Sequence, residues 1–423
     1  WSNAVGGLIL AQLKALGWTD NSTTATFSAI TTAGMFLGAL VGGIIGDKTG
    51  RRNAFILYEA IHIASMVVGA FSPNMDFLIA CRFVMGVGLG ALLVTLFAGF
   101  TEYMPGRNRG TWSSRVSFIG NWSYPLCSLI AMGLTPLISA EWNWRVQLLI
   151  PAILSLIATA LAWRYFPESP RWLESRGRYQ EAEKVMRSIE EGVIRQTGKP
   201  LPPVVIADDG KAPQAVPYSA LLTGVLLKRV ILGSCVLIAM NVVQYTLINW
   251  LPTIFMTQGI NLKDSIVLNT MSMFGAPFGI FIAMLVMDKI PRKTMGVGLL
   301  ILIAVLGYIY SLQTSMLLIT LIGFFLITFV YMYVCYASAV YVPEIWPTEA
   351  KLRGSGLANA VGRISGIAAP YAVAVLLSSY GVTGVFILLG AVSIIVAIAI
   401  ATIGIETKGV SVESLSIYAV ANK

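Results

Sequence analysis

Long apolar runs alternate with short polar junctions along the whole chain. Residues 1–16 resemble the outer part of one more apolar helix, so we expect its inner half and the native N-terminus to precede Trp1. The pattern predicts an all-α membrane protein of twelve transmembrane helices, six on each side of a polar segment at residues 167–228. A membrane helix needs about 20 predominantly apolar residues, and such runs lie near residues 24–45, 54–71, 77–101, 112–138, 146–166, 229–257, 265–287, 294–311, 315–342, 355–379 and 383–404.

Charged junctions between these runs occur in the same order in the two halves of the chain. Each junction of the first half has a counterpart about 240 residues later. A fixed offset indicates a duplicated half, and repeated six-helix halves are typical of secondary transporters. Three pairs of junctions share the offset: residues 47–52 with residues 288–293, Glu102 and Arg109 with Glu344 and Arg353, and Glu168 with Glu406.

The polar segment divides the chain into parts. Residues 169–189 carry an amphipathic pattern with a period near 3.6, which predicts short helices lying along the membrane. Residues 192–217 have the Pro- and Gly-rich composition of a flexible tether. We therefore expect an N-terminal six-helix bundle at 1–166, a cytoplasmic helical linker at 167–228, a C-terminal six-helix bundle at 229–404 and a cytoplasmic tail at 405–423.

Composition and charge support a bilayer environment and fix an orientation. The chain is 56% hydrophobic and 12% charged, with a mean hydropathy of +0.76, which excludes an ordinary soluble domain. If the N-terminus is cytoplasmic, most of the 29 Lys and Arg lie in cytoplasmic loops, and only Lys14, Arg145 and Lys263 lie in loops on the other side. This positive-inside asymmetry predicts that both termini are cytoplasmic. It also makes the net charge of +9 an insertion signal, so we expect no nucleic-acid partner.

No pattern of catalytic or metal-binding residues is present in the sequence. There is one histidine, and the four cysteines lie inside apolar runs without paired spacing. Gly86, Gly88 and Gly90 lie within an apolar helix with no strand before them, so they indicate close helix packing, not a dinucleotide loop. We expect no enzymatic activity, no cofactor and no metal site.

The junction Gly43-x3-Asp47-x2-Gly50-Arg51-Arg52 resembles the signature loop of the major facilitator superfamily. In that family, the acid and the arginines latch the cytoplasmic ends of neighbouring helices in the outward-facing state. An alternative interpretation is that Arg51 and Arg52 only anchor the topology. The resemblance implies a conformational latch formed by Asp47, Arg51, Arg52, Glu102, Arg109, Arg115, Asp288, Arg292, Glu344 and Arg353.

Further motifs resemble the sugar-porter branch of this superfamily and bacterial inner-membrane metabolite transport proteins. They are Arg82-x3-Gly86, Glu102-x2-Pro105-x3-Arg109-Gly110, Pro167-Glu168-Ser169-Pro170-Arg171-Trp172-Leu173 and Pro343-Glu344-Ile345-Trp346-Pro347. The resemblance implies a monomeric rocker-switch transporter in the bacterial inner membrane.

The seventh helix departs from the sugar-porter pattern. Ala239 and Met240 stand where sugar porters carry a glutamine pair. A hexose needs fixed amide partners for its hydroxyls, so transport of an ordinary hexose is disfavoured. Asn241, Gln244 and Asn249 remain as candidate substrate contacts, together with the aromatic residues Trp250 and Trp122.

The eleventh helix indicates an acidic substrate. Its pattern Gly356-x2-Asn359-x2-Gly362-Arg363 resembles the organic-ion branch, in which an arginine at this position accompanies anion transport. An unpaired guanidinium near mid-bilayer is costly, so it should face a water-filled cavity or an acid. We expect Arg363 to bind a substrate carboxylate, with Arg82 adding positive potential. Hydrogen bonds from Arg363 to backbone carbonyls of a neighbouring helix are the alternative.

Energy coupling has one candidate pair. Proton-coupled sugar porters pair an arginine at the position of Arg82 with an Asp of the first helix, and this Asp aligns with Ser2. Glu59 is a deep carboxylate, and His62 lies one turn away on the same helix face, so the two residues are a candidate proton-titrating pair. Alternatively, Glu59 pairs with Arg115 or with a loop arginine.

These features predict a secondary active transporter of a small polar metabolite, specifically a hydroxylated organic or sugar acid, with protons as a candidate coupling ion. Proton symport of a neutral sugar or polyol is the alternative. A receptor or sensor that binds its ligand without moving it is the third interpretation.

Overall fold

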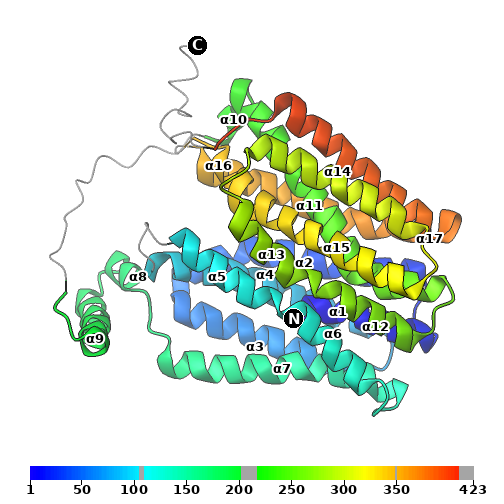
Figure 1. Ribbon diagram of the computed structural model, residues 1–423. Coiled ribbons are helices and arrows are strands. Elements are labelled where there is room, and N and C mark those ends of the chain that lie inside the picture. The colour runs from blue at the N-terminus through cyan, green and yellow to red at the C-terminus, as the bar shows by residue number, and fades with distance from the viewer. Residues whose placement is uncertain (104–108, 202–216, 348–349, 409–423) are drawn as a thin grey trace.

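The computed structural model describes residues 1–103, 109–201, 217–347 and 350–408 (Figure 1). Every regular element in these ranges is a helix, and nine of the helices there are long and apolar enough to cross a membrane. One of them, α17 (Lys351–Ile403), holds two crossings because its helix is broken at Gly381, where φ is 65°. The short helix α1 (Ser2–Ala15) and the pair α5 (Arg109–Asn121) and α6 (Ser123–Leu134) supply two more. The predicted twelve-helix membrane fold is confirmed.

The first bundle is formed by α1, α5 and α6 with four long helices. Glycines bring α2 and α4 into backbone contact, since a Cβ on Gly38 would lie 2.0 Å from the carbonyl oxygen of Val87. Gly86 and Gly90 of α4 meet the α2 backbone in the same way, so their predicted packing role is confirmed. The four long helices are α2 (Asn21–Thr49), α3 (Arg51–Ala70), α4 (Met75–Tyr103) and α7 (Ala140–Tyr165).

The second bundle repeats this arrangement with α17 and the helices that precede it. Tyr333, Tyr336 and Tyr341 are fully buried in its core, and the rings of Tyr336 and Tyr341 stack 5.0 Å apart. The remaining helices are α11 (Gly224–Thr257), α12 (Leu262–Met273), α13 (Gly275–Val286), α14 (Arg292–Ser311) and α15 (Met316–Cys335), which continues through the π-helix η1 (Tyr336–Tyr341) into α16 (Val342–Glu344).

The linker contains the short helices predicted for residues 169–189, namely α8 (Pro170–Ser175) and α9 (Tyr179–Thr197). Helix α9 continues into the predicted tether, and a further short helix, α10 (Tyr218–Leu221), was not predicted. Ser169 caps α8 by accepting a hydrogen bond from the backbone N–H of Trp172. The Trp172 indole N–H donates to the carbonyl of Asp47 over 2.7 Å, so α8 is fixed to the end of α2. We call the end of the bundles at which α8, α9 and α10 lie the linker end.

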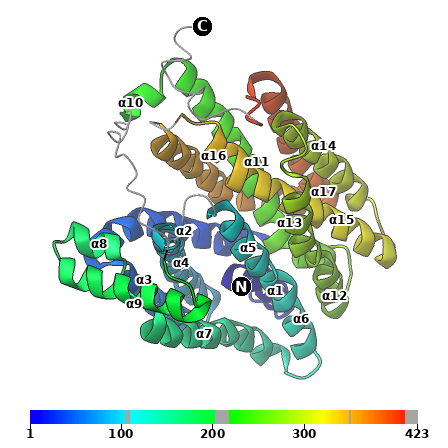
Figure 2. The same cartoon turned by 60° about the vertical axis from the view of Figure 1, so that its left-hand side comes forward.

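The two bundles meet at the end opposite the linker end and diverge toward it (Figures 1 and 2). At the opposite end, the Asn21 side-chain amide donates to Ser378 Oγ over 2.9 Å. Farther in, the Asn269 amide donates to Ser128 Oγ over 3.1 Å. A Cβ on Gly7 of α1 would lie 2.4 Å from the carbonyl oxygen of Ile248 in α11. These contacts join α1, α2 and α6 to α11, α12 and α17.

Candidate functional site

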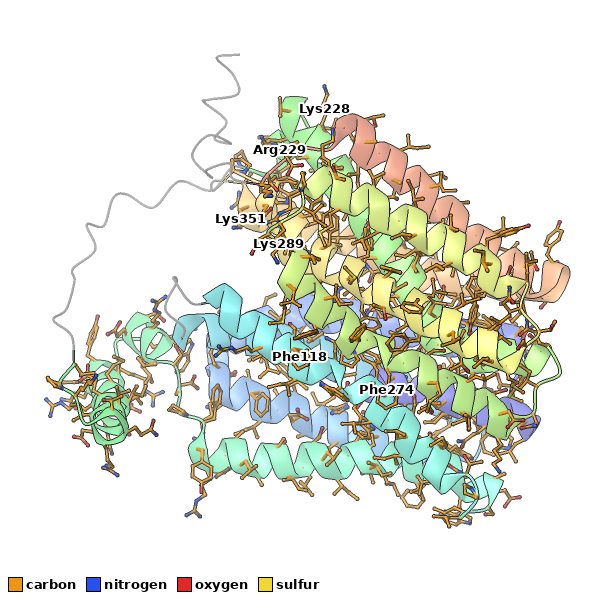
Figure 3. All side chains as sticks on the ribbon, viewed as in Figure 1. Phe118, Lys228, Arg229, Phe274, Lys289 and Lys351 are labelled. Atoms are coloured by element: carbon orange, nitrogen blue, oxygen red, sulfur yellow. The ribbon has the colours of Figure 1, made fainter. Side chains whose placement is uncertain are left out.

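Aromatic side chains line the boundary between the bundles. Figure 3 shows Phe118 and Phe274 there, one from each bundle. The Trp122 ring makes edge-on contacts with both, at 6.5 Å and 6.4 Å between centroids. Tyr124 and Tyr331 face each other across the same boundary at 5.2 Å. The structure thus brings the predicted Trp122 to the boundary, and it adds Tyr331, which no sequence motif marked.

The four candidates on α11 do not share one environment. Gln244 is half-buried and lines a cavity together with Tyr245. Asn241 is buried, and its amide donates to the carbonyl of Leu237 within α11 over 2.8 Å. Asn249 and Trp250 are also buried, and the ring of Trp250 packs in an apolar cluster. Gln244 is therefore the α11 candidate placed to meet a ligand in this conformation.

The cavity lined by Gln244 has a volume of about 530 Å³ and is shared by both bundles. Its polar lining comes from the first bundle and from α11, so a ligand here would contact both bodies. The polar side chains in the lining are Ser2, Asn3, Glu59, His62, Tyr124, Ser155, Gln244 and Tyr245.

Glu59 and His62 are in contact on the cavity wall. His62 Nδ1 lies 3.3 Å from Glu59 Oε2, and His62 Nε2 lies 2.9 Å from Ser2 Oγ. Ser155 Oγ lies 3.4 Å from His62 Nδ1. His62 is 3% exposed and Glu59 is 9% exposed. The predicted pairing of the two side chains is confirmed, and its role in coupling stays a prediction.

Arg82 lies in the interior of the first bundle. It is 3% exposed, and its Nη1 donates to the carbonyl oxygen of Ser2 over 3.1 Å. The guanidinium carbon lies 4.7 Å from the centre of the Phe27 ring, a favourable cation–π distance. Gly6 leaves room for it, since a Cβ there would lie 2.6 Å from Arg82 Nη2. Ser2 thus stands beside Arg82, as the alignment predicted, and the role of Arg82 toward substrate stays a prediction.

Arg363 lies on a stretch of α17 that contacts α11 of its own bundle and α2 of the first bundle. Next to it, Gly362 packs against Asn241 and Leu237 of α11, and Gly366 packs against Tyr245 of α11 and Thr32 of α2. Arg363 Nη1 is buried and has no hydrogen-bond partner within the part of the chain that the structure describes. The alternative of bonds from this nitrogen to backbone carbonyls therefore finds no support in those residues.

The predicted latch residues pair within their own bundles at the linker end. Arg51 Nη1 donates to Asp47 Oδ1 over 2.8 Å. Arg292 donates to Glu344 Oε2 and to Asp288 Oδ1, both over 3.1 Å. The other members are placed as follows: Arg52 donates to the carbonyl of Trp163, Arg115 is exposed, Arg353 lies over the Tyr218 ring at 5.2 Å, and the side chains of Glu102 and Arg109 lie outside the described ones. Their role as a latch stays a prediction.

Glu168 and Glu406, the third pair that shares the repeat offset, both cap helices. The sequence alone assigned them no role. Glu168 accepts hydrogen bonds from the backbone N–H groups of Arg51 and Arg52 at the start of α3. Glu406 accepts from those of Arg292 and Lys293 at the start of α14, over 2.7 and 3.1 Å. Burial opposes ionisation of Glu406, but these bonds and one from the Lys408 N–H outweigh it, so the pKa of Glu406 is lowered.

Comparisons with known proteins agree with this geometry. The model of the Major Facilitator Superfamily matches residues 1–370. The chain is 44% identical to the inner membrane metabolite transport protein YdjE of Escherichia coli, over 97% of this chain and 90% of YdjE. It is 26% identical to the niacin transporter NiaP of Acinetobacter baylyi, over 91% and 85% of the two chains. A solved structure of the E. coli xylose transporter XylE, partially occluded and inward open, superposes with a TM-score of 0.76 at 18% identity, covering 97% of this chain and 96% of XylE.

Proposed function

Because the chain belongs to the Major Facilitator Superfamily, we propose that it carries a hydroxylated organic or sugar acid across the bacterial inner membrane by rocker-switch alternating access. At the coarser level, it is a membrane-spanning metabolite transporter and not an enzyme. The substrate class, the membrane orientation and the site residues belong to the proposal.

The observation that carries the proposal is the unsatisfied guanidinium nitrogen of Arg363. Arg363 is half-buried, and it is its Nη1 that is withdrawn from water; a buried donor without a partner is costly unless a ligand or water compensates it. A carboxylate is the ligand that matches a guanidinium best, because two parallel N–H···O bonds form at once. The position of Arg363, between α11 and α2, would let a bound acid join the two bundles.

The rest of the site supports an acid over a hexose. Gln244 is the half-buried amide on the cavity wall, whereas Ala239 is fully buried where sugar porters carry a glutamine. A polyhydroxylated ring would find few fixed amide partners here. The relative named as a niacin transporter supports a carboxylate ligand as well, since niacin is an aromatic acid.

The arrangement of the bundles supports alternating access. Lys228, Lys289 and Lys351 gather at the linker end of the second bundle (Figure 3). By the positive-inside rule, this end faces the cytoplasm. Since the bundles meet at the opposite end, the conformation is inward-facing, and the intra-bundle pairing of Arg51 and Arg292 fits a latch that is released in this state.

A thermal-shift screen of purified protein tests the proposal. The ligands are D-gluconate, nicotinate, D-xylose and myo-inositol, and the proteins are wild type, Arg363→Ala and Arg363→Lys. A ligand at 100 times its Kd stabilises the native state by about 2.7 kcal/mol. We expect the acids to raise the melting temperature of the wild type, less so that of Arg363→Lys, and not that of Arg363→Ala.

The matched control is Arg178→Ala, because Arg178 is exposed in the linker and bonded to Glu181. It should respond to acids as the wild type does. Stabilisation by D-xylose or myo-inositol in all four proteins would instead support the alternative, proton symport of a neutral sugar or polyol. The Gln244 and Tyr124 side chains in the cavity are the observation that favours this alternative.

A further inference from the structure

We infer that Glu59 and His62 form a single proton-binding site that drives transport, and that Ser2 completes it. The inference deepens the proposed function and, for its transport experiment, rests on it. Both side chains line the cavity that Gln244 and Tyr245 of the other bundle also line. A proton bound here is therefore held beside the substrate candidate Gln244, whereas Arg363 is not among the described residues that line this cavity.

The hydrogen-bond geometry suits the doubly protonated imidazole. An imidazolium has two N–H donors and needs two acceptors. His62 Nδ1 faces Glu59 Oε2 at 3.3 Å, and Nε2 faces Ser2 Oγ at 2.9 Å. When the imidazole is neutral, the Ser2 hydroxyl can rotate and donate to Nε2 instead. Ser2 thus serves both protonation states without a change in backbone position.

The packing around the pair fixes it in place. A Cβ on Gly88 of α4 would lie 3.1 Å from the carbonyl of Tyr58 and 3.2 Å from the backbone nitrogen of His62, so α4 presses directly on this part of α3. Ser155 of α7 lies 3.4 Å from His62 Nδ1 on another side.

The charged and titratable groups near the pair are few. On α4, Arg82 reaches it through Ser2, whose carbonyl accepts from Nη1 and whose hydroxyl meets His62. On α6 and α11, Tyr124 and Tyr245 line the same cavity, and α1 contributes Trp1, Ser2 and Asn3. On its own helix, Tyr58 points away and donates to the carbonyl of Gly42 in α2.

The proton balance follows from these charges. With His62 neutral, the pair carries one buried negative charge, and Arg82 is the nearest described cation that is linked to it. One proton taken from the outer side converts the pair to an imidazolium–carboxylate with no net charge, and release to the inner side restores the negative charge. A monocarboxylate that moves with one proton is carried without net charge transfer. A neutral sugar moved by the same proton would carry one positive charge.

The single histidine of the chain makes the pair directly observable. Full-length protein, labelled with nitrogen-15 histidine and purified through a tag without histidine, would be titrated by NMR in lipid nanodiscs. We expect Glu59→Gln to change the chemical shift of His62 Nδ1, because that nitrogen loses its carboxylate partner. Ser2→Ala should change the shift of His62 Nε2 instead, and Glu174→Gln in the linker should change neither. Unchanged His62 signals in Glu59→Gln would overturn the inference.

Transport in liposomes gives the second test, with D-gluconate as the probe. We expect the ratio of pH-gradient-driven accumulation to gradient-free exchange to fall at least about tenfold in Glu59→Gln and in His62→Gln, but not in Glu174→Gln. A potassium diffusion potential alone should not drive accumulation. If the ratio is unchanged in both variants, the inference is wrong.

The two proposals fail in different ways. If the wild type does not exchange D-gluconate but accumulates D-xylose, the proposed acid substrate is wrong, and the variants are then compared on D-xylose. If it exchanges neither, the NMR titration decides the inference by itself.

Discussion

The linker ends of the two bundles share one arrangement of charged residues but differ in their surroundings. In both, an acid from a distant segment caps the helix that follows the charged loop: Glu168 caps α3, and Glu406 caps α14. In both, an arginine one turn after an aspartate bonds back to it. The capping is thus shared, and the differences lie in what surrounds the arginine and in the residue before the helix.

The arginine side chain is largely buried in both copies, and that of Arg51 is 15% exposed. Arg292 is 7% exposed, and it bonds to Glu344, to Asp288 and to the carbonyl of Met287. In the first bundle, Arg51 bonds to Asp47, which is 72% exposed, and to the carbonyl of Gly46. There the linker contributes as well, because Trp172 and Arg176 both donate to the carbonyl of Asp47.

The residue that precedes the capped helix also differs. Gly50 has φ +96°, and a Cβ on it would lie 2.2 Å from Glu168 Oε2. Its counterpart Pro291 has φ −55°, which any residue adopts. The comparison teaches that the acid cap and the arginine–aspartate pair are shared, while the first copy depends in addition on a glycine and on the linker.

The largest expected effect comes from removing Arg292. Arg292→Ala should lower the free energy of unfolding by about 3 kcal/mol, because Glu344 and the Met287 carbonyl lose a buried partner. Arg51→Ala should also lower the free energy of unfolding, because Asp47 and the Gly46 carbonyl lose their donor. Thermal unfolding of both variants in the same detergent measures the two losses. An unchanged melting temperature in Arg292→Ala would contradict the prediction.

The second-largest loss of stability is expected on substitution of Gly50. Gly50→Ala should cost about 2 kcal/mol, because alanine is strained at this φ and its Cβ would displace the Glu168 carboxylate. Pro291→Ala is the matched control and should cost less than about 1 kcal/mol. If Gly50→Ala and Pro291→Ala lower the melting temperature by the same amount, the cap formed by Glu168 does not depend on a glycine at position 50.

Loss of either acid cap should lower the free energy of unfolding by a similar amount. Glu168→Gln and Glu406→Gln should each lose about 1 kcal/mol, because a neutral amide oxygen replaces a carboxylate at a helix N-terminus. Glu174→Gln, in the exposed part of α8, serves as the control with no expected loss. If only one of the two cap substitutions has an effect, the caps are not equivalent.

The smallest effect is a pH dependence of the second cap. The pKa of Glu406 is lowered in the folded state, so its contribution is present above the unfolded-state pKa of about 4.3 and is lost as pH falls through the folded value. The melting-temperature gap between wild type and Glu406→Gln should therefore be constant from pH 7 to about pH 5 and narrow as the pH falls below about 4.3. A gap that does not narrow below about pH 4.3 would show that the charge of Glu406 is not what stabilises the cap.

Much of this architecture could be predicted from the sequence, because apolar run length and repeat offset are local features. The contact of Glu59 with His62 was predictable for the same reason, since residues three apart share a helix face. The link from His62 to Ser2 was not, because it depends on how α1 packs on α3. Periodicity gives the face of a helix but not the neighbour that covers it.

The two lone arginines show the same limit. Arg82 and Arg363 each interrupt an apolar helix, and the sequence suggested one role for both. In the structure, Arg82 contacts Ser2, Met85 and Phe27 of its own bundle, whereas Arg363 lies where α17 meets α2 of the other bundle. Each has one buried nitrogen without a hydrogen-bond partner among the described residues. Only the packing of helices distant in sequence separates them. The roles of Glu168 and Glu406 as caps were hidden for the same reason.

The contact at Gly7 has a mechanical consequence. Here α1 of one bundle and α11 of the other touch through main-chain atoms, with no side chain between them. Main-chain atoms have no rotamers, so this point cannot yield by repacking when the bundles rock. In the proposed rocker-switch motion it would act as a fulcrum, with displacements smallest beside it and growing along each helix. The linker end, which lies far from this contact, would then move the most.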